Sequence, residues 1–189
     1  TNDEHQSPLR APICGGAPAV VLAEEADGQG GELVVDDTHV YWSTGYWGLF
    51  RVTKEGGARE QVTSDQGYGL AQTGTHLYWF ASWIENSVKK HAIRRVAKAG
   101  GAPESFVEPL PEPYPAGSMA MDDTHVYWIA GTGSFGVYRA AFAGGDAEMV
   151  GWGEGIPKGM AMDATHVYAI SDFSNQTWVQ RVPKAGGDG

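Results

Sequence analysis

The sequence lacks a second cysteine. Cys14 is the one cysteine in 189 residues, so the chain can form neither an internal disulfide nor a cysteine-based zinc or iron–sulfur site. We interpret Cys14 as a small buried packing residue, and an intermolecular disulfide is the alternative.

Long apolar runs and basic charge are also scarce. No apolar run approaches the roughly 18 residues that a membrane-spanning helix requires. The chain as given shows no signal peptide, so we expect that any export signal has already been removed. The 13 Lys and Arg against 23 Asp and Glu give a formal net charge of −10. Nucleic acids and anionic membranes attract basic surfaces. We therefore expect no nucleic-acid partner and no membrane insertion.

Glycine, in contrast, is abundant and recurs in phase. The chain has 27 glycines, about twice the ordinary frequency. A Thr-His-Val/Leu-Tyr motif begins at Thr38, Thr75, Thr124 and Thr165. Five Gly-Gly pairs, 41 to 44 residues apart, lie at 15/16, 56/57, 100/101, 144/145 and 186/187. The two markers together indicate four repeats of about 40 residues.

Each repeat has the two-residue period of β-strands, and long helical periodicity is absent. In the first repeat we expect strands at 33–36, 39–42, 49–52 and 60–62. The Gly-Gly pair supplies the positive φ that a tight hairpin between the third and fourth strands requires. Four short strands in each repeat predict an all-β fold, a four-bladed β-propeller of four-stranded antiparallel blades.

The two ends of the chain suggest how the ring closes. We expect residues 1–14 to form an N-terminal extension and 15–189 a single propeller domain, with blades at about 31–63, 68–108, 117–151 and 158–187. The last repeat stops after its third strand, whereas residues 17–23 resemble a fourth strand. We therefore predict that this N-terminal strand completes the C-terminal blade and closes a monomeric ring. An open half-ring that dimerises to eight blades is the alternative.

Several segments resemble a known type of repeat. The segments that carry the resemblance are Met160–Asp163, His166–Tyr168, Val40–Gly45 and Phe50–Gly57. They are similar to the bacterial relatives of YWTD and NHL repeat propellers, and the resemblance covers roughly residues 15 to 187. The chain resembles hemopexin in blade number only. The resemblance implies a bacterial propeller that is secreted or periplasmic. Related propellers include binders, scaffolds and enzymes, so the fold alone does not choose among these functions.

The repeated polar residues are predicted to be structural. The carboxylates of Asp36, Asp122 and Asp163 can accept backbone N–H bonds and fix the turn before the second strand, with calcium binding as the alternative. We interpret the four histidines of the Thr-His motif as hairpin hydrogen-bonding groups rather than metal ligands. The arginines that recur in the third strands are expected to pair between blades, with the turn carboxylates as candidate partners. They are Arg51, Arg95, Arg139 and Arg181.

Aromatic residues gather in the predicted connections. An amphipathic aromatic cluster is a common way to build a binding site. We therefore predict binding of a carbohydrate, a peptide or a small apolar ligand on this loop face, while shielding of blade edges is the alternative. The candidate ligand-binding residues are Tyr46, Trp47, Tyr68, Trp83, Tyr114, Phe135, Trp152, Phe173 and Trp178.

Carboxylates on the same predicted face leave an enzyme open as an alternative. General acid–base groups at the axis mouth would suit a lyase or a lactone hydrolase, as in larger relatives of this fold. No nucleophile motif is present and no cofactor is predicted, although a divalent metal such as calcium would suit the carboxylates. A third alternative is a protein-interaction scaffold. The catalytic candidates are Glu85, Glu112, Glu154 and Asp172, and the metal candidates are Asp27, Asp65, Glu112 and Glu154.

Overall fold

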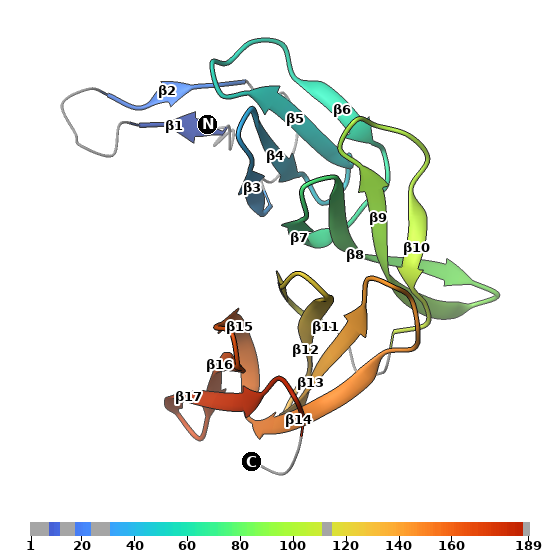
Figure 1. The fold of residues 1–189 in the computed structure, drawn as a ribbon, viewed down its shortest axis with the longest axis vertical. Coiled ribbons are helices and arrows are strands. Elements are labelled where there is room, and N and C mark those ends of the chain that lie inside the picture. Colours follow the sequence, from blue (N-terminus) through green and yellow to red (C-terminus); the bar gives the residue numbers. More distant parts are fainter. Residues whose placement is uncertain (1–7, 12–17, 24–30, 111–114, 187–189) are drawn as a thin grey trace. The chain divides into compact units, whose positions relative to one another are not determined.

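The computed structural model describes residues 8–11, 18–23, 31–110 and 115–186, and all of its regular elements are strands (Figure 1). Within those ranges there is no helix, and hence none long and apolar enough to cross a membrane. Blade 1 contains β3 (Leu33–Val35), β4 (His39–Ser43), β5 (Leu49–Thr53) and β6 (Glu60–Thr63). Blade 2 contains β7 (Tyr68–Gln72), β8 (His76–Glu85), β9 (Val88–Ala97) and β10 (Glu104–Val107). Blade 3 contains β11 (Pro115–Met121), β12 (His125–Gly131), β13 (Ser134–Ala141) and β14 (Glu148–Glu154), and blade 4 contains β15 (Ile156–Met162), β16 (His166–Phe173) and β17 (Gln176–Pro183).

Each blade is a small antiparallel sheet whose strands follow one another in sequence order. The all-β class and the count of four blades are therefore confirmed. The predicted role of the glycine pairs is also confirmed, because Gly56 and Gly57 have φ values of 89° and 129° in the turn between β5 and β6. Two-residue turns at 86–87 and 174–175 carry positive φ at both positions, as tight hairpins require.

The chain divides into two compact units, residues 1–81 with 95–104 and residues 82–94 with 105–189. Each unit has its own hydrophobic core of buried side chains. The core of the first unit includes Leu22, Ala23, Val40, Trp42, Phe50 and Val52. The core of the second unit includes Tyr127, Ile129, Phe135, Val137, Val150, Val167, Ala169 and Val182.

The turn carboxylates fix the turn before the second strand, as predicted. Asp36 Oδ1 accepts hydrogen bonds from the backbone N–H groups of Thr38 (2.9 Å) and His39 (2.8 Å). The Nδ1 atom of His39 lies 2.7 Å from Thr38 Oγ1, and the same contacts recur at Asp122 and Asp163. The histidines thus stabilise the hairpins, as the sequence indicated.

A lysine joins each of two turns to the neighbouring blade. In the first unit, Lys98 Nζ lies 3.0 Å from Asp36 Oδ2 and 5.3 Å from the centroid of the Tyr41 ring. Arg51 Nη1 donates to the carbonyl oxygen of the same lysine at 2.7 Å. We call the Asp36–Lys98 contact, and its counterpart in the second unit, the interblade ion pair.

The second unit repeats this arrangement. Lys184 Nζ lies 2.6 Å from Asp122 Oδ2 and 4.9 Å from the centroid of the Tyr127 ring, while Arg139 Nη1 donates to the Lys184 carbonyl at 2.6 Å. The lysine side chain is 10% exposed. Its apolar stem is therefore buried between the blades and its ammonium group neutralises the turn carboxylate.

Arg51 and Arg139 do link neighbouring blades, but the printed ion pairs of the repeated arginines do not involve the turn carboxylates. Their guanidinium groups bind a glutamate at the start of the fourth strand of the same blade, in the pairs Arg51–Glu60, Arg95–Glu104 and Arg139–Glu148. The lysine ammonium occupies the turn carboxylate instead, so the predicted Asp–Arg pairing is wrong.

The predicted closing strand requires a correction. Val20 and Val21 form β2, which pairs with β1 (Leu9–Arg10) rather than with β17. The physical reason is burial, because Leu22 at the end of this segment packs in the core of the first unit, and its carbonyl accepts a bond from Gly57 N–H at 3.2 Å. In the described part of the chain, blade 4 therefore has three strands.

Replacing Lys184 by methionine tests the interblade ion pair. The Lys184→Met variant should lose about 1–3 kcal/mol of unfolding free energy, because the partly buried carboxylate of Asp122 loses its charged partner. Lys158→Met is the control, since the ion pair between Lys158 and Asp172 is about half exposed and should contribute less than about 1 kcal/mol. Urea unfolding measures both, and equal losses would contradict a special role for Lys184.

The turn carboxylates also predict how stability depends on pH. Burial raises the pKa of Asp122, but the hydrogen bonds from Lys184, Thr124 and His125 outweigh it and hold the pKa well below its ordinary value. A lowered folded-state pKa contributes stability above the unfolded value of about 3.9, and this stability is lost as pH falls from about 5. Asp122→Asn should therefore lose less unfolding free energy between pH 6 and pH 3 than the parent protein. Parallel pH curves for the two proteins would show that Asp122 contributes nothing.

Candidate functional site

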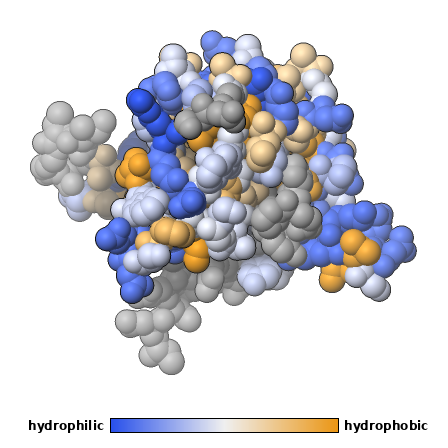
Figure 2. Space-filling model, turned by 90° about the horizontal axis from the view of Figure 1, so that it is seen from below, coloured by the Kyte–Doolittle hydropathy of each residue, from blue (hydrophilic) through white to orange (hydrophobic). Residues whose placement is uncertain are grey.

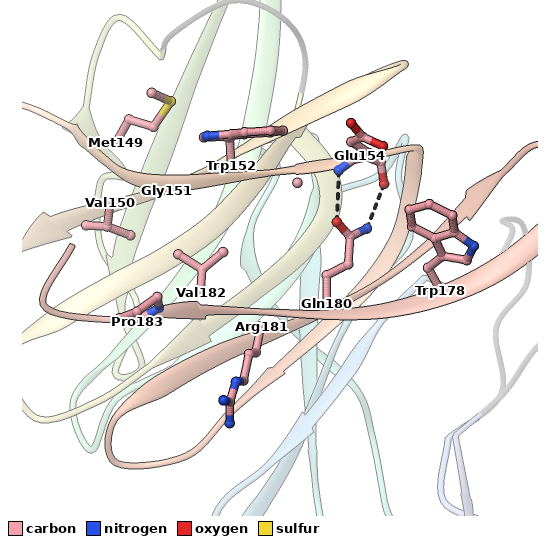
Figure 3. A pocket seen from close by; sticks show the side chains of 11 residues that line it. Met149, Val150, Gly151, Trp152, Glu154, Trp178, Gln180, Arg181, Val182 and Pro183 are labelled. Carbon is pink, nitrogen blue, oxygen red and sulfur yellow. Dashed lines mark hydrogen bonds between the residues drawn. The ribbon is translucent and has the colours of Figure 1, made fainter. Parts of the chain in front are cut away.

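A groove of about 660 Å³ runs between β14 and β17 in the second unit (Figure 3). Residues 149–154 form one wall, and Trp178 with residues 180–183 forms the other. It brings together three residues that the sequence singled out, namely Trp152, Glu154 and Trp178. This groove is the candidate functional site.

The groove follows the open edge of blade 4. In the described residues, β17 is the edge strand of its sheet, whereas the other three blades carry a fourth strand in this position, namely β6, β10 and β14. An edge strand presents a row of backbone N–H and C=O groups that can pair with another strand. The open edge and the groove therefore belong to one surface.

Small and branched residues form the floor of the groove. Val150 and Val182 are both buried there. A Cβ atom on Gly151 would clash with Val182 Cγ1, so glycine allows β14 to approach β17 this closely. The floor is consequently apolar and tightly packed.

Gln180 joins the two walls of the groove. Its Nε2 donates to the carbonyl of Glu154 at 2.7 Å, and its Oε1 accepts from Glu154 N–H at 3.0 Å (Figure 3). The same Nε2 is 2.7 Å from Ser171 Oγ. The amide thus satisfies the backbone at the end of β14 in the way that a neighbouring strand would, and it fixes the position of Glu154.

Two tryptophans give the groove its aromatic character. Trp152 on β14 is 64% exposed. Trp178 on β17 packs against Phe173 with ring centroids 5.0 Å apart, and its Nε1 donates to Gln176 Oε1 at 3.3 Å. One ring is thus exposed and the other is held in place, which suits an amphipathic ligand.

The acidic candidates that the structure describes differ in their surroundings. Hydrogen bonds from Thr177 and Lys158 lower the pKa of Asp172, so this carboxylate is ionised and already paired. Glu85 is exposed beside the two-residue turn at 86–87. Within residues 8–11, 18–23, 31–110 and 115–186, no three His, Cys, Asp or Glu side chains lie close enough to hold a metal ion.

The remaining predicted residues are dispersed. Tyr46 and Trp47 are exposed between β4 and β5, and Trp47 lines a smaller pocket of about 270 Å³ in the first unit. Trp83 in β8 and Asp65 are half-buried, and Tyr68 in β7 contacts Phe80. Asp27, Glu112, Tyr114 and Cys14 lie outside the described residues. On the face drawn in Figure 2, hydrophobic residues are scattered among hydrophilic ones.

Most of the aromatic candidates lie in strands, not in connections, and this corrects the sequence prediction. Phe135 belongs to β13 and is 2% exposed in the core of the second unit. Because tight two-residue turns join β8 to β9 and β16 to β17, segments that we predicted as loops continue as strands. Trp83, Phe173 and Trp178 are therefore strand residues.

The sequence matches no protein-family model and no curated protein. Among solved structures, the chain is similar to the computationally designed protein Ika8, with 9% identity and a TM-score of 0.48, over 84% of this chain and 61% of that chain. It is also similar to a chain of an S. cerevisiae complex of a Dbp5 variant bound to Nup159, a Gle1 variant, IP6 and ADP, with 12% identity and a TM-score of 0.42, over 87% of this chain and 50% of that chain. The chain thus spans less than two thirds of each of these two chains.

Replacing Gln180 by leucine tests how the groove is held. Gln180→Leu keeps a similar volume but leaves the part-buried backbone of Glu154 without its partners, which should lower the unfolding free energy by about 1–3 kcal/mol. Gln66 is exposed, so Gln66→Leu is the control and should change stability by less than about 0.5 kcal/mol. Urea unfolding of both variants measures the difference. Equal stability of Gln180→Leu and the parent would contradict the assigned role.

Proposed function

We propose that this protein is a binding module that takes up an extended peptide along the open edge of β17. The observation that supports this proposal is the groove along β17, which in the described residues is the edge strand of a three-stranded blade, whereas the other three blades have four strands. A peptide in this position would form main-chain hydrogen bonds with β17, the recognition mode known as strand addition.

The side chains of the groove support a peptide over a sugar or a small apolar ligand. A sugar-binding face needs many polar groups aimed at one place, but the amide of Gln180 is already bound to Glu154 and Ser171. An apolar ligand needs an enclosed cavity, whereas the described residues bound this groove only by β14 and β17, and Trp152 is largely exposed. An elongated site beside β17, which pairs on one edge with β16 and is the edge strand of the described sheet, suits an extended backbone.

The environments of the carboxylates Glu154 and Asp172 also suit a binding role better than a catalytic one. Asp172 is held ionised by Thr177 and Lys158, so it is a poor general acid near neutral pH. The backbone of Glu154 is fixed by Gln180, and its side chain lies at the rim of the groove. We therefore assign both residues to the binding surface.

A peptide copied from a fourth strand of this protein tests the proposal. The probe has the sequence of residues 56–64, Gly-Gly-Ala-Arg-Glu-Gln-Val-Thr-Ser, and its binding is measured by calorimetry. We expect Trp178→Ala to weaken binding by about tenfold, the value of one aromatic contact of about 1.4 kcal/mol. Trp47→Ala is the matched control, because Trp47 lies in the first unit, and it should leave the affinity unchanged.

Two methylated peptides test the main-chain contact. One peptide is N-methylated at Glu60 and Val62, and the other at Arg59 and Gln61. Because only alternate amides of a strand point towards one neighbour, one methylated peptide should lose binding and the other should keep it. Equal binding by both methylated peptides would contradict strand addition. Failure of the unmodified peptide to bind would overturn the proposal.

A further inference from the structure

Arg181 differs from the other three repeated arginines. Arg51, Arg95 and Arg139 each bind a glutamate that opens the fourth strand of the same blade, and their side chains are 22–29% exposed. Arg181 occupies the same position in β17, opposite Tyr168 as Arg139 is opposite Tyr127. It is exposed, and within the described part of the chain its guanidinium has no ion pair.

The partner of each arginine lies at a fixed place. The glutamate comes nine residues after its arginine and is the first residue of the fourth strand, as in Arg51–Glu60 and Arg139–Glu148. In blades 1 and 3 the two residues lie directly opposite each other in the antiparallel register. In blade 1, the carboxylate Oε2 of Glu60 accepts from both Nε (2.8 Å) and Nη2 (2.6 Å) of Arg51. The same register beside β17 would place a carboxylate on Arg181.

The three fourth strands also share an apolar residue two positions after the glutamate. The segments are Glu60-Gln61-Val62, Glu104-Ser105-Phe106 and Glu148-Met149-Val150. Val62 and Val150 are buried. A segment with this pattern offers the same charge and the same apolar group to blade 4.

We infer that the open edge of β17 selects an extended segment of the pattern Glu-x-Val or Glu-x-Phe, whose glutamate forms a two-bond ion pair with Arg181. This inference rests on the proposed peptide binding and adds the chemistry of the partner. The arginine fork is geometrically matched to a carboxylate, and a cross-strand ion pair of this kind fixes the register of an added strand.

The test is a double-mutant cycle between protein and peptide. The peptide of residues 56–64 and its Glu60→Gln variant are titrated into the parent protein and into Arg181→Gln. We expect the Glu60→Gln peptide to bind the parent about 3- to 10-fold more weakly, as for a charged hydrogen bond at a partly exposed site. The two peptides should bind the Arg181→Gln protein with equal affinity. Arg181 is exposed, so this variant should keep the stability of the parent.

The other outcomes show whether the glutamate contact alone is wrong or whether the proposed peptide binding is wrong as well. If both peptides bind the parent equally, the glutamate contact is wrong and strand addition stands. If the glutamate peptide keeps its advantage on Arg181→Gln, another cation binds the carboxylate and the assignment to Arg181 is overturned. If neither peptide binds any of the proteins, both the inference and the proposed function are wrong.

Discussion

The interblade ion pair ties a turn carboxylate to the lysine of the next blade at two places in the structure. Small blades bury little core alone, so each needs a firm contact with its neighbour. Lys184 comes directly after the last residue of β17, and its ammonium binds Asp122 while its carbonyl accepts a bond from Arg139. The ion pair therefore holds the end of β17 against blade 3 and fixes one wall of the groove relative to the other. Thr73 stands at the position of Asp36 and Asp122, and Phe142 stands at the position of Lys98 and Lys184. The carboxylate and the lysine are thus replaced together, and Phe142 packs on Phe106 instead.

The fold could be predicted from the sequence because its signals are local and repeated. The phased Gly-Gly pairs mark hairpins that need positive φ, and Asp36, Asp122 and Asp163 stand where a carboxylate can bind two amides of the same turn. Such contacts join residues two or three positions apart, so the turn geometry can be predicted from the local sequence pattern alone. The turns, the strands and the number of blades are the consequence.

The site was only partly predictable, because it depends on pairings between distant segments. The residue types alone made candidates of Trp152, Glu154 and Trp178. They line one groove because β14 approaches β17 closely, which Gly151 permits. The lysines carried a repeat signal, since Lys54, Lys98 and Lys184 each stand two residues before a Gly-Gly pair, but the repeat alone does not show which carboxylate each lysine binds. Arg10 could have been recognised, because it precedes a Gly-Gly pair by five residues as Arg51 does. It donates to the carbonyl of Lys54 at 2.6 Å, which reproduces the contact of Arg51 with Lys98 and explains why β1 and β2 pack on blade 1.

If the edge of β17 receives a strand, as we propose, amide hydrogen exchange detects the new hydrogen bonds at individual residues. Exchange is measured residue by residue with and without a saturating amount of the peptide of residues 56–64. Strand addition predicts slower exchange at alternate amides within Gln176–Pro183, since only these acquire new hydrogen bonds. The edge strand β2 serves as the internal reference and should be unchanged. Unaltered exchange along β17, or equal protection of β2 and β17, would show that the peptide does not add a strand to β17.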